Sequence, residues 1–332
     1  MTFEDRVRAL EPWGFTPRQA RFVVMVAMHG GYCLRRQYQT FAGVAYGSVV
    51  REFLDALVTR RLAKRFSFRR NRGHLYHLHA TAIYRALGQE GNRNRRRVSP
   101  AQIARKLMAL DYLLSEPQVE WLATEQEKVA LFRDRFGIGV EDLPQRMYTA
   151  ADAGRDTTRF FIHKQPIGMA PDSDAPEFVC VVPDLDGRAL EQFLEDHRRL
   201  FARLPAWRVT AVCPPHVAGL PVCQSVFDRV VRVSADVSAD AVEELSWYFA
   251  TREKVDRDDV AAFSMADITR FRTIRARQSS PRVEALYDRW RQHGSAALAA
   301  PAQDAVALTS GRLVVKALSH RYEQFGSLPG VY

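Results

Sequence analysis

The residues of this sequence best suited to a chemical task form a basic cluster near position 65. Five lysines and arginines fall within nine positions: Lys64, Arg65, Arg69, Arg70 and Arg72. Two aromatic residues, Phe66 and Phe68, are interleaved with them. Ammonium and guanidinium groups bind phosphate through charge-assisted hydrogen bonds. The cluster therefore predicts a surface that binds a polyanion.

The net charge of the whole chain comes from the same region. The 332 residues have a formal charge of +10. Residues 60–97 hold twelve lysines or arginines and one acid, Glu90, a local net charge of +11, so the rest of the chain has a net charge of −1. A solvated basic face would give the same count. A charge excess confined to one segment is also the footprint expected of a nucleic-acid-binding surface.

Other chemistries have less support from the sequence. The chain has no phosphate-binding glycine loop, no dinucleotide-binding motif, no nucleophilic serine motif and no H-E-x-x-H motif. His77 and His79 form an H-x-H pair on one face of a predicted strand, but no third ligand follows nearby. The four cysteines are far apart and predict neither disulfides nor a zinc site. We expect no metal and no cofactor.

A metal-dependent nuclease is an alternative that needs carboxylates and a lysine on adjoining strands. The best local match is the segment 160–164, which ends in Lys164 but has Ile162 where a carboxylate is needed. Acids could come from neighbouring strand ends: Asp142, Asp184 and Asp186. The match is incomplete, so the sequence favours a protein without catalytic activity and assigns no catalytic residue.

The basic cluster follows three predicted helices. Thr16-Pro17, an N-cap residue and a proline suited to the first helical position, begins a helix that ends at Gly30-Gly31. A short segment, 34–43, leads to a third helix over about 47–62, whose apolar residues recur at intervals of three and four. Two strand-like segments, AKRFSF and HLYHLHA, then flank the turn RRNRG. This order predicts a winged helix-turn-helix.

In a winged helix-turn-helix the last helix enters the major groove, and neighbouring segments contact the DNA backbone. Three residues at the start of the third helix are candidates for base contacts: Tyr46, Ser48 and Arg51. The candidates for phosphate contacts lie on the preceding helix, on the hairpin and in the segment that follows it: Arg35, Arg36, Lys64, Arg65, Arg69, Arg70, Arg72, Arg95, Arg96 and Arg97. Arg35 and Arg36 could equally face water.

The predicted fold class is multidomain, with α+β and α/β parts. Residues 1–87 form the winged helix, and residues 88–100 form a basic linker that either follows the DNA or is a solvated coil. Residues 101–235 contain the apolar strands EFVCVV and WRVTAVC on either side of a helix, a βαβ unit with a parallel pair, and SVFDRVVRVS as a third candidate strand. Residues 236–332 are expected to be a helical C-terminal region that packs on the body or forms a dimer interface.

This layout, over about residues 15–215, resembles the replication-relaxation family of mobile genetic elements. The likeness rests on the winged helix, the arginine-rich connector and the small α/β domain. It implies a DNA-binding role in a plasmid or phage context. The sequence departs from the family pattern in its longer C-terminal region and in Ile162, which stands where a nuclease-like site would want an acid.

The sequence leads to one principal hypothesis and two alternatives. We expect a sequence-specific double-stranded DNA-binding protein, a homodimer that regulates transcription or replication of a mobile element. The alternatives are a metal-dependent DNA-processing enzyme and a protein-interaction module whose basic hairpin meets an acidic partner. No apolar run is long enough to span a bilayer and the N-terminus lacks a signal-peptide pattern, so the expected location is the cytoplasm, without a membrane partner.

Overall fold

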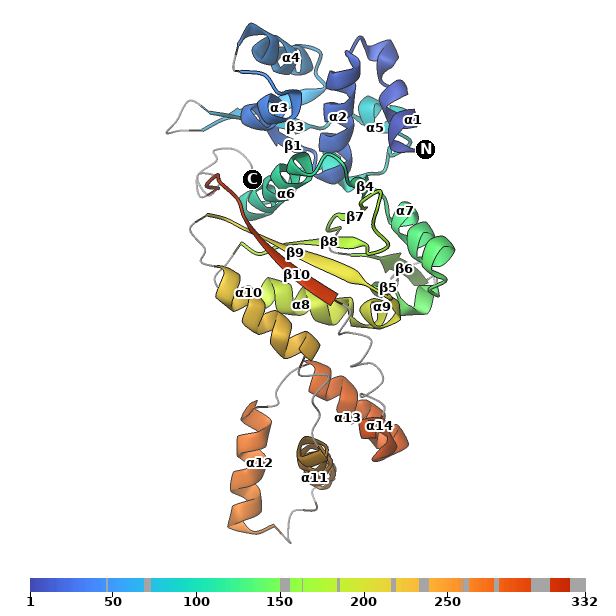
Figure 1. Ribbon diagram of the computed structural model, residues 1–332, viewed down its shortest axis with the longest axis vertical. Helices are drawn as coiled ribbons and strands as arrows, with labels where there is room; N and C mark the ends of the chain where they lie inside the picture. The colour runs from blue at the N-terminus through green and yellow to red at the C-terminus, as the bar shows by residue number, and fades with distance from the viewer. Residues whose placement is uncertain are drawn as a thin grey trace.

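The protein has a mixed α+β fold in a computed structural model (Figure 1). Helices and a small sheet formed by the N-terminal residues lie at one end, a larger sheet occupies the centre, and a group of C-terminal helices lies at the other end. The structure describes the following residues: 1–45, 47–68, 73–149, 156–162, 164–183, 186–215, 219–232, 239–257, 259, 263–277, 281–299 and 311–322.

The N-terminal helices begin and end at the residues that the sequence indicates. In α2 (Pro17–His29) the Thr16 hydroxyl oxygen accepts a hydrogen bond from the Gln19 N–H, and the Gln19 side-chain oxygen accepts one from the Thr16 N–H. The shorter α3 (Arg35–Ala42) ends at Gly43, whose φ of +63° is left-handed. α4 (Ser48–Thr59) buries its apolar stripe, with Phe53 and Leu54 in a core shared with α2 and α3. The remaining elements here are α1 (Phe3–Arg8) and the 3₁₀ turn η1 (Glu11–Trp13).

A three-stranded antiparallel sheet follows these helices in the order β1-β3-β2. It consists of β1 (Tyr32–Leu34), β2 (Ala63–Ser67) and β3 (His74–Leu78). The β2–β3 pair is the predicted hairpin, whereas β1 was not expected. Alternation along β3 sends Tyr76 to the helical core of α2 and α4 and Leu75 to the opposite side. Both side chains are buried, so the small sheet is covered on its two faces.

The second face of this sheet packs on α6 (Pro100–Ser115), which also covers the central sheet. Leu75 and Leu107 belong to the same buried cluster as Val179 and Val212 of the central strands. A continuous core therefore joins parts that the sequence predicts as separate domains, and the boundaries at residues 87, 100 and 235 remain predictions. Two short elements precede α6: α5 (Thr81–Ala86) and the 3₁₀ turn η2 (Arg93–Arg95).

The central sheet has five strands in the order β10-β9-β8-β7-β4. Its members are β4 (Glu120–Leu122), β7 (Ile167–Met169), β8 (Glu177–Val181), β9 (Trp207–Cys213) and β10 (Gly311–Ala317). β8 and β9 are parallel and are connected through α8 (Arg188–Asp196) and α9 (Arg198–Arg203), which confirms the predicted βαβ unit. Every residue of β8 is buried, as its continuous apolar run predicts.

Two parts of the secondary-structure prediction are wrong. The third candidate strand, 225–234, is helical over its described residues: residues 225–232 lie in α10 (Gly219–Phe227) and the π-helical turn η5 (Asp228–Arg232). Val226 and Val230, one turn apart, are both buried, so the apolar spacing is helical. The C-terminal region is not wholly helical either, because β10 pairs with β9 in parallel. Its residues alternate between partly buried and exposed, as an edge strand requires.

The other elements flank this sheet or form the C-terminal group. On the side of β4 lie α7 (Glu125–Ala130), η3 (Leu131–Arg135), η4 (Val140–Asp142) and the hairpin of β5 (Gln145–Thr149) and β6 (Asp156–Phe160). The C-terminal helices are α11 (Ala239–Asp256), α12 (Met265–Arg277), α13 (Pro281–His293) and α14 (Ala296–Ala299). They have a small core of their own around Phe249 and Tyr287.

Candidate nucleic-acid interface

The first turn of α4 offers side chains to solvent. Ser48, Val49 and Arg51 are exposed there, and Val49 keeps 60% of its surface. The opposite face of the same helix is buried through Val50 and Phe53. An exposed arginine with a hydroxyl and an apolar side chain at a helix N-terminus can read base edges in a major groove. Tyr46, the third predicted base contact, lies outside the described residues.

Arg65 of β2 lies on the same side of the molecule as Arg51. Its guanidinium is 3.2 Å from the Asp55 carboxylate, and both side chains are nearly half exposed. Asp55 lies one turn after Arg51 on α4, so the two share a helix face. Burial lowers the pKa of His74, and the charges of Arg65 and Arg35 lower it further. Arg35 therefore belongs to the same basic group around the hairpin and α4.

Lys64 lies on the other face of β2. Its ammonium is 6.0 Å from the Phe66 ring centre, and the Arg97 guanidinium lies 5.8 Å from the same ring. Both cations act on His79, whose pKa is lowered first by burial and then by these charges. Because side chains alternate along β2, the predicted phosphate contacts fall into two groups. Arg65 lies on the sheet face toward α4, and Lys64 and Arg97 form a second basic group on the opposite face. Arg69, Arg70 and Arg72 lie outside the described residues.

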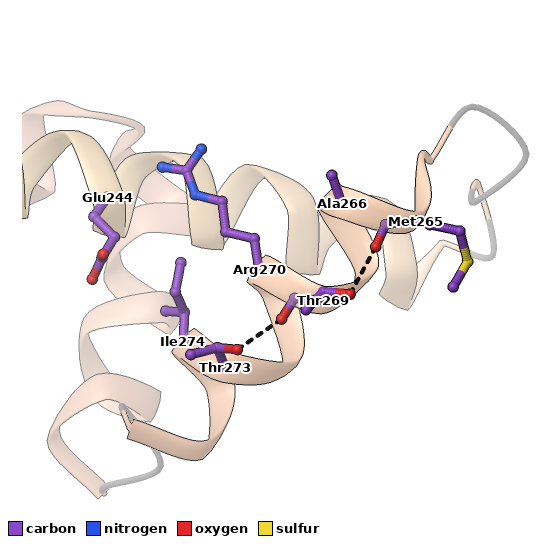
Figure 2. A pocket seen from close by; sticks show the side chains of 7 residues that line it. All are labelled: Glu244, Met265, Ala266, Thr269, Arg270, Thr273 and Ile274. Atoms are coloured by element: carbon purple, nitrogen blue, oxygen red, sulfur yellow. Dashed lines mark hydrogen bonds between the residues drawn. The ribbon is translucent and has the colours of Figure 1, made fainter.

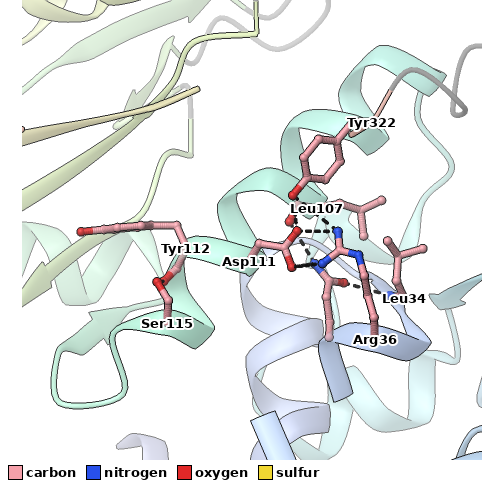
Figure 3. Close-up of polar contacts among 8 residues, drawn as sticks. Leu34, Arg36, Leu107, Asp111, Tyr112, Ser115 and Tyr322 are labelled. Atoms are coloured by element: carbon pink, nitrogen blue, oxygen red, sulfur yellow. Dashed lines mark hydrogen bonds and ion pairs between the residues drawn. The ribbon is translucent and has the colours of Figure 1, made fainter. Parts of the chain in front are cut away.

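Arg36 is engaged inside the protein and is no longer a candidate for phosphate contacts. Figure 3 shows its guanidinium against Asp111 of α6, with both nitrogen–oxygen distances at 2.6 Å. The Tyr322 hydroxyl, from the residues that follow β10, also bonds to the Asp111 carboxylate. Gln37 adds hydrogen bonds from its amide to the Leu107 carbonyl, at 2.9 Å, and to Asp111, at 3.0 Å. The sequence prediction placed Arg36 outward, but this face of α3 packs on α6.

Residues 93–95 are folded onto the end of α2 through Asn94, which sequence reasoning missed. The buried Asn94 amide donates to the carbonyls of Ala27, at 3.1 Å, and Met28, at 3.0 Å, and its oxygen accepts from Lys106 at 2.8 Å. Gly31 permits this approach, because a Cβ on its left-handed backbone would lie 2.2 Å from the Asn94 carbonyl oxygen. The paired glycines after α2 were the available signal.

The arginines around Asn94 differ in exposure. Arg96 and Arg97 are exposed, whereas Arg95 is half-buried and its Nε is covered without a hydrogen-bond partner in the described structure. Anchoring of Asn94 holds the chain on either side of it, so Arg96 and Arg97 are presented from a fixed backbone. The segment is therefore held against α2 at Asn94, and contact of its arginines with the DNA backbone stays a prediction.

One histidine of the H-x-H pair, His77 of β3, has a structural role, whereas His79 follows the strand and is exposed. The His77 ring stacks on Tyr32, with centres 4.1 Å apart, and its Nε2 donates to the Asn94 carbonyl at 3.1 Å. Burial lowers the pKa of His77 to about 4, so the ring is neutral at physiological pH. Within the part of the chain that the structure describes, no group of three or more histidine, cysteine, aspartate or glutamate side chains has the arrangement of a metal site.

The acids proposed for a nuclease have other partners. Asp142 is 3.1 Å from Arg203, and Asp186 accepts a hydrogen bond from the Arg188 N–H at the start of α8. Asp184 lies outside the described residues. Partial burial and then the charge of Arg93 lower the pKa of Lys164, and the nearby Glu125 carboxylate opposes that shift. These positions do not favour metal-dependent hydrolysis.

Besides this interface, the residues that the structure describes line at least two hollows. One, of about 340 Å³, lies beside β5 and the C-terminal end of α8. The other, of about 630 Å³, is an open depression over α12 with Met265 and Arg270 on its wall (Figure 2). The hydroxyls of Thr269 and Thr273 donate to carbonyls one turn earlier in their own helix, at 2.8 and 2.9 Å. These two hydroxyl protons are therefore used within α12.

Comparison with known proteins gives no relative from which to infer function. No protein-family model, no curated protein and no solved structure matches this chain. None of the helices in the described ranges has the length and apolar composition needed to cross a membrane.

Proposed function

We propose that this protein binds double-stranded DNA through a winged helix-turn-helix formed by α2, α3, α4 and the β2–β3 hairpin. The observation that carries the proposal is the first turn of α4, which has exposed side chains beside a basic hairpin while the apolar face of the helix is anchored in the core. α4 would enter the major groove with Ser48 and Arg51 toward the bases, and Arg35 and Arg65 would lie beside the backbone.

The hairpin turn would be the wing. Arg69, Arg70 and Arg72 belong to the segment of the sequence that joins β2 to β3, and they would bind backbone phosphates. Lys64, Arg96 and Arg97 would extend the positive field on the far side of the wing, where they attract DNA without reading bases. The protein would act in the cytoplasm as a homodimer that regulates transcription or replication of a mobile element, a role for which the family resemblance is the support.

Salt-dependent binding of a labelled random duplex of about 30 base pairs tests this proposal. Each phosphate contact contributes about −0.9 to the slope of log affinity against log salt. We expect the triple variant Arg69→Ala, Arg70→Ala, Arg72→Ala to flatten the slope by roughly two to three units. Arg289→Ala, at an exposed arginine on α13, is the matched control and should leave the slope unchanged. Equal slopes for parent and triple variant would remove the wing assignment.

A selected binding site tests the base contacts separately. Arg51→Ala should reduce discrimination between the selected site and random DNA by about tenfold, because an arginine–guanine contact is worth about 1–3 kcal/mol. The same variant should change affinity for random DNA much less. An equal loss for both duplexes would make Arg51 a phosphate contact instead.

A further inference from the structure

The smaller hollow is a compact cavity with a mixed lining. Its volume is about 340 Å³, and it lies between the start of β5, the chain that follows β6 and the end of α8. Phe161, Ile167 and Phe193 give it an apolar wall, and all three are buried. This volume lies at the lower end of the range of small-molecule sites, which combine apolar walls with a few placed polar groups.

Cations gather at the mouth of this cavity. Arg146 and Lys164 line it and are exposed. Arg146 lies directly opposite Arg159 in the β5–β6 ladder, a cross-strand pairing of like charges that is unfavourable on its own. The pKa of Lys164 is lowered by burial and then by the charge of Arg93. The Glu125 carboxylate, 3.9 Å from the Arg159 guanidinium, offsets part of this positive charge, and an anion in the cavity would offset more of it.

The backbone around Lys164 is strained in a way that shapes the cavity. Phe161 and Lys164 have left-handed φ values of +49° and +50°, which side chains other than glycine rarely adopt. Hydrogen bonds hold both residues, from the Phe161 N–H to the Pro144 carbonyl at 2.8 Å and from the Lys164 N–H to the Phe161 carbonyl at 2.9 Å. Such strain persists only where the surroundings impose it, and it clusters at ligand sites.

Three glutamines also line the cavity, beside Asp196 and His197: Gln145, Gln165 and Gln192. The Gln165 Oε1 is buried and has no hydrogen-bond partner within the described structure, while the Gln165 carbonyl accepts from the buried Lys128 at 2.6 Å. Gln192 donates to Asp196, another lining residue, at 2.7 Å. A carboxamide can donate and accept at once, and it therefore pairs with the edge of a heterocyclic base.

We propose that this cavity binds a nucleotide. The phosphate lies between Arg146 and Lys164, and the base occupies the apolar interior with an N–H group toward Gln165 Oε1. A free mononucleotide and the phosphorylated end of a DNA strand present the same chemistry. The cavity is lined by residues outside α2, α3, α4 and the β2–β3 hairpin, so this proposal does not depend on duplex binding by α4.

Calorimetric titration of the full chain tests this site. The probes are the four deoxynucleoside monophosphates, their nucleosides, and a single strand of about eight nucleotides with a 5′-phosphate. We expect at least one phosphorylated probe to bind, and the matching probe without phosphate to bind at least tenfold more weakly, since charged hydrogen bonds are lost. The variant Arg146→Gln, Lys164→Gln should lose at least tenfold, and Arg188→Gln, at an exposed arginine outside the lining, should bind as the parent does.

The outcomes separate the two sources of the ligand. Binding of a mononucleotide that the double variant loses supports a free nucleotide, and binding of the phosphorylated strand alone, again lost in the variant, supports a DNA end. Absence of binding by all phosphorylated probes, or equal binding by parent and double variant, overturns the proposal. Gln165→Leu keeps Arg146 and Lys164 and provides a second test. It should weaken binding of the nucleotide that the parent binds most tightly. Duplex affinity of these variants should match that of the parent, which keeps this result distinct from failure of the winged-helix proposal.

Discussion

Replacement of Asn94 by alanine should destabilise the protein strongly, although the residue lies in a polar segment rich in arginine. Its side chain donates to two carbonyls at the end of α2 and accepts from the Lys106 ammonium. A neutral hydrogen bond contributes about 1 kcal/mol and one to a charged group about 1.5–3 kcal/mol. The three together give a loss of about 4 kcal/mol in the free energy of unfolding.

Lys106 makes this cost larger than a simple loss of two neutral bonds. Its ammonium has two acceptors, the Gly30 carbonyl and Asn94 Oδ1, and burial already lowers its pKa to about 8. Asn94→Ala leaves the ammonium with the Gly30 carbonyl alone of these two acceptors. Part of the loss should therefore disappear in the double variant Asn94→Ala, Lys106→Met, because no buried charge then lacks an acceptor.

Urea unfolding measures the effect through the midpoint and the slope. A stability change shifts the midpoint at constant slope. Arg96→Ala, at an exposed neighbour, is the control and should stay within about 0.5 kcal/mol of the parent. A loss below about 1 kcal/mol for Asn94→Ala would refute the reasoning, since it would mean that water replaces the three bonds.

Three further outcomes follow from charged side chains. Asp55→Asn should raise affinity for random DNA about two- to fivefold in a filter-binding assay, because it releases Arg65 from a half-exposed ion pair; weaker binding would contradict this. Asp111→Ala should cost about 2 kcal/mol in urea unfolding, since Arg36 would lose its bidentate partner in a part-buried position; a neutral effect would contradict the role of this pair. Burial lowers the pKa of Lys128 to about 7, below its value in the unfolded chain. Above pH 7 the unfolded chain therefore binds more protons than the folded protein, and the free energy of unfolding should rise with pH. The expected rise is up to about 1.4 kcal/mol per pH unit between pH 8 and 10. Lys128→Met should flatten that rise, and an unchanged slope would show that the lysine stays charged in the folded protein.

Several parts of this fold could be predicted because their signals are local. Thr16-Pro17 starts α2 since the hydroxyl and the fixed proline φ act within one turn. The apolar spacing of α4 and the continuous apolar run of β8 report burial directly. The basic segment 60–97 and the hairpin within it follow from composition and turn residues. These features depend on neighbours within a few positions.

Other features depend on contacts between residues far apart in the chain, and only the tertiary structure decided them. Arg36 and Arg65 look alike in sequence, yet Arg36 meets Asp111, 75 positions away, while Arg65 stays at the surface. β10 pairs with β9 across about a hundred residues, which no local pattern specifies. The cavity beside Lys164 combines three separate segments. Sequence determines which side chains can bury or carry charge, whereas the packing of distant elements determines which of those charges remain available to a ligand.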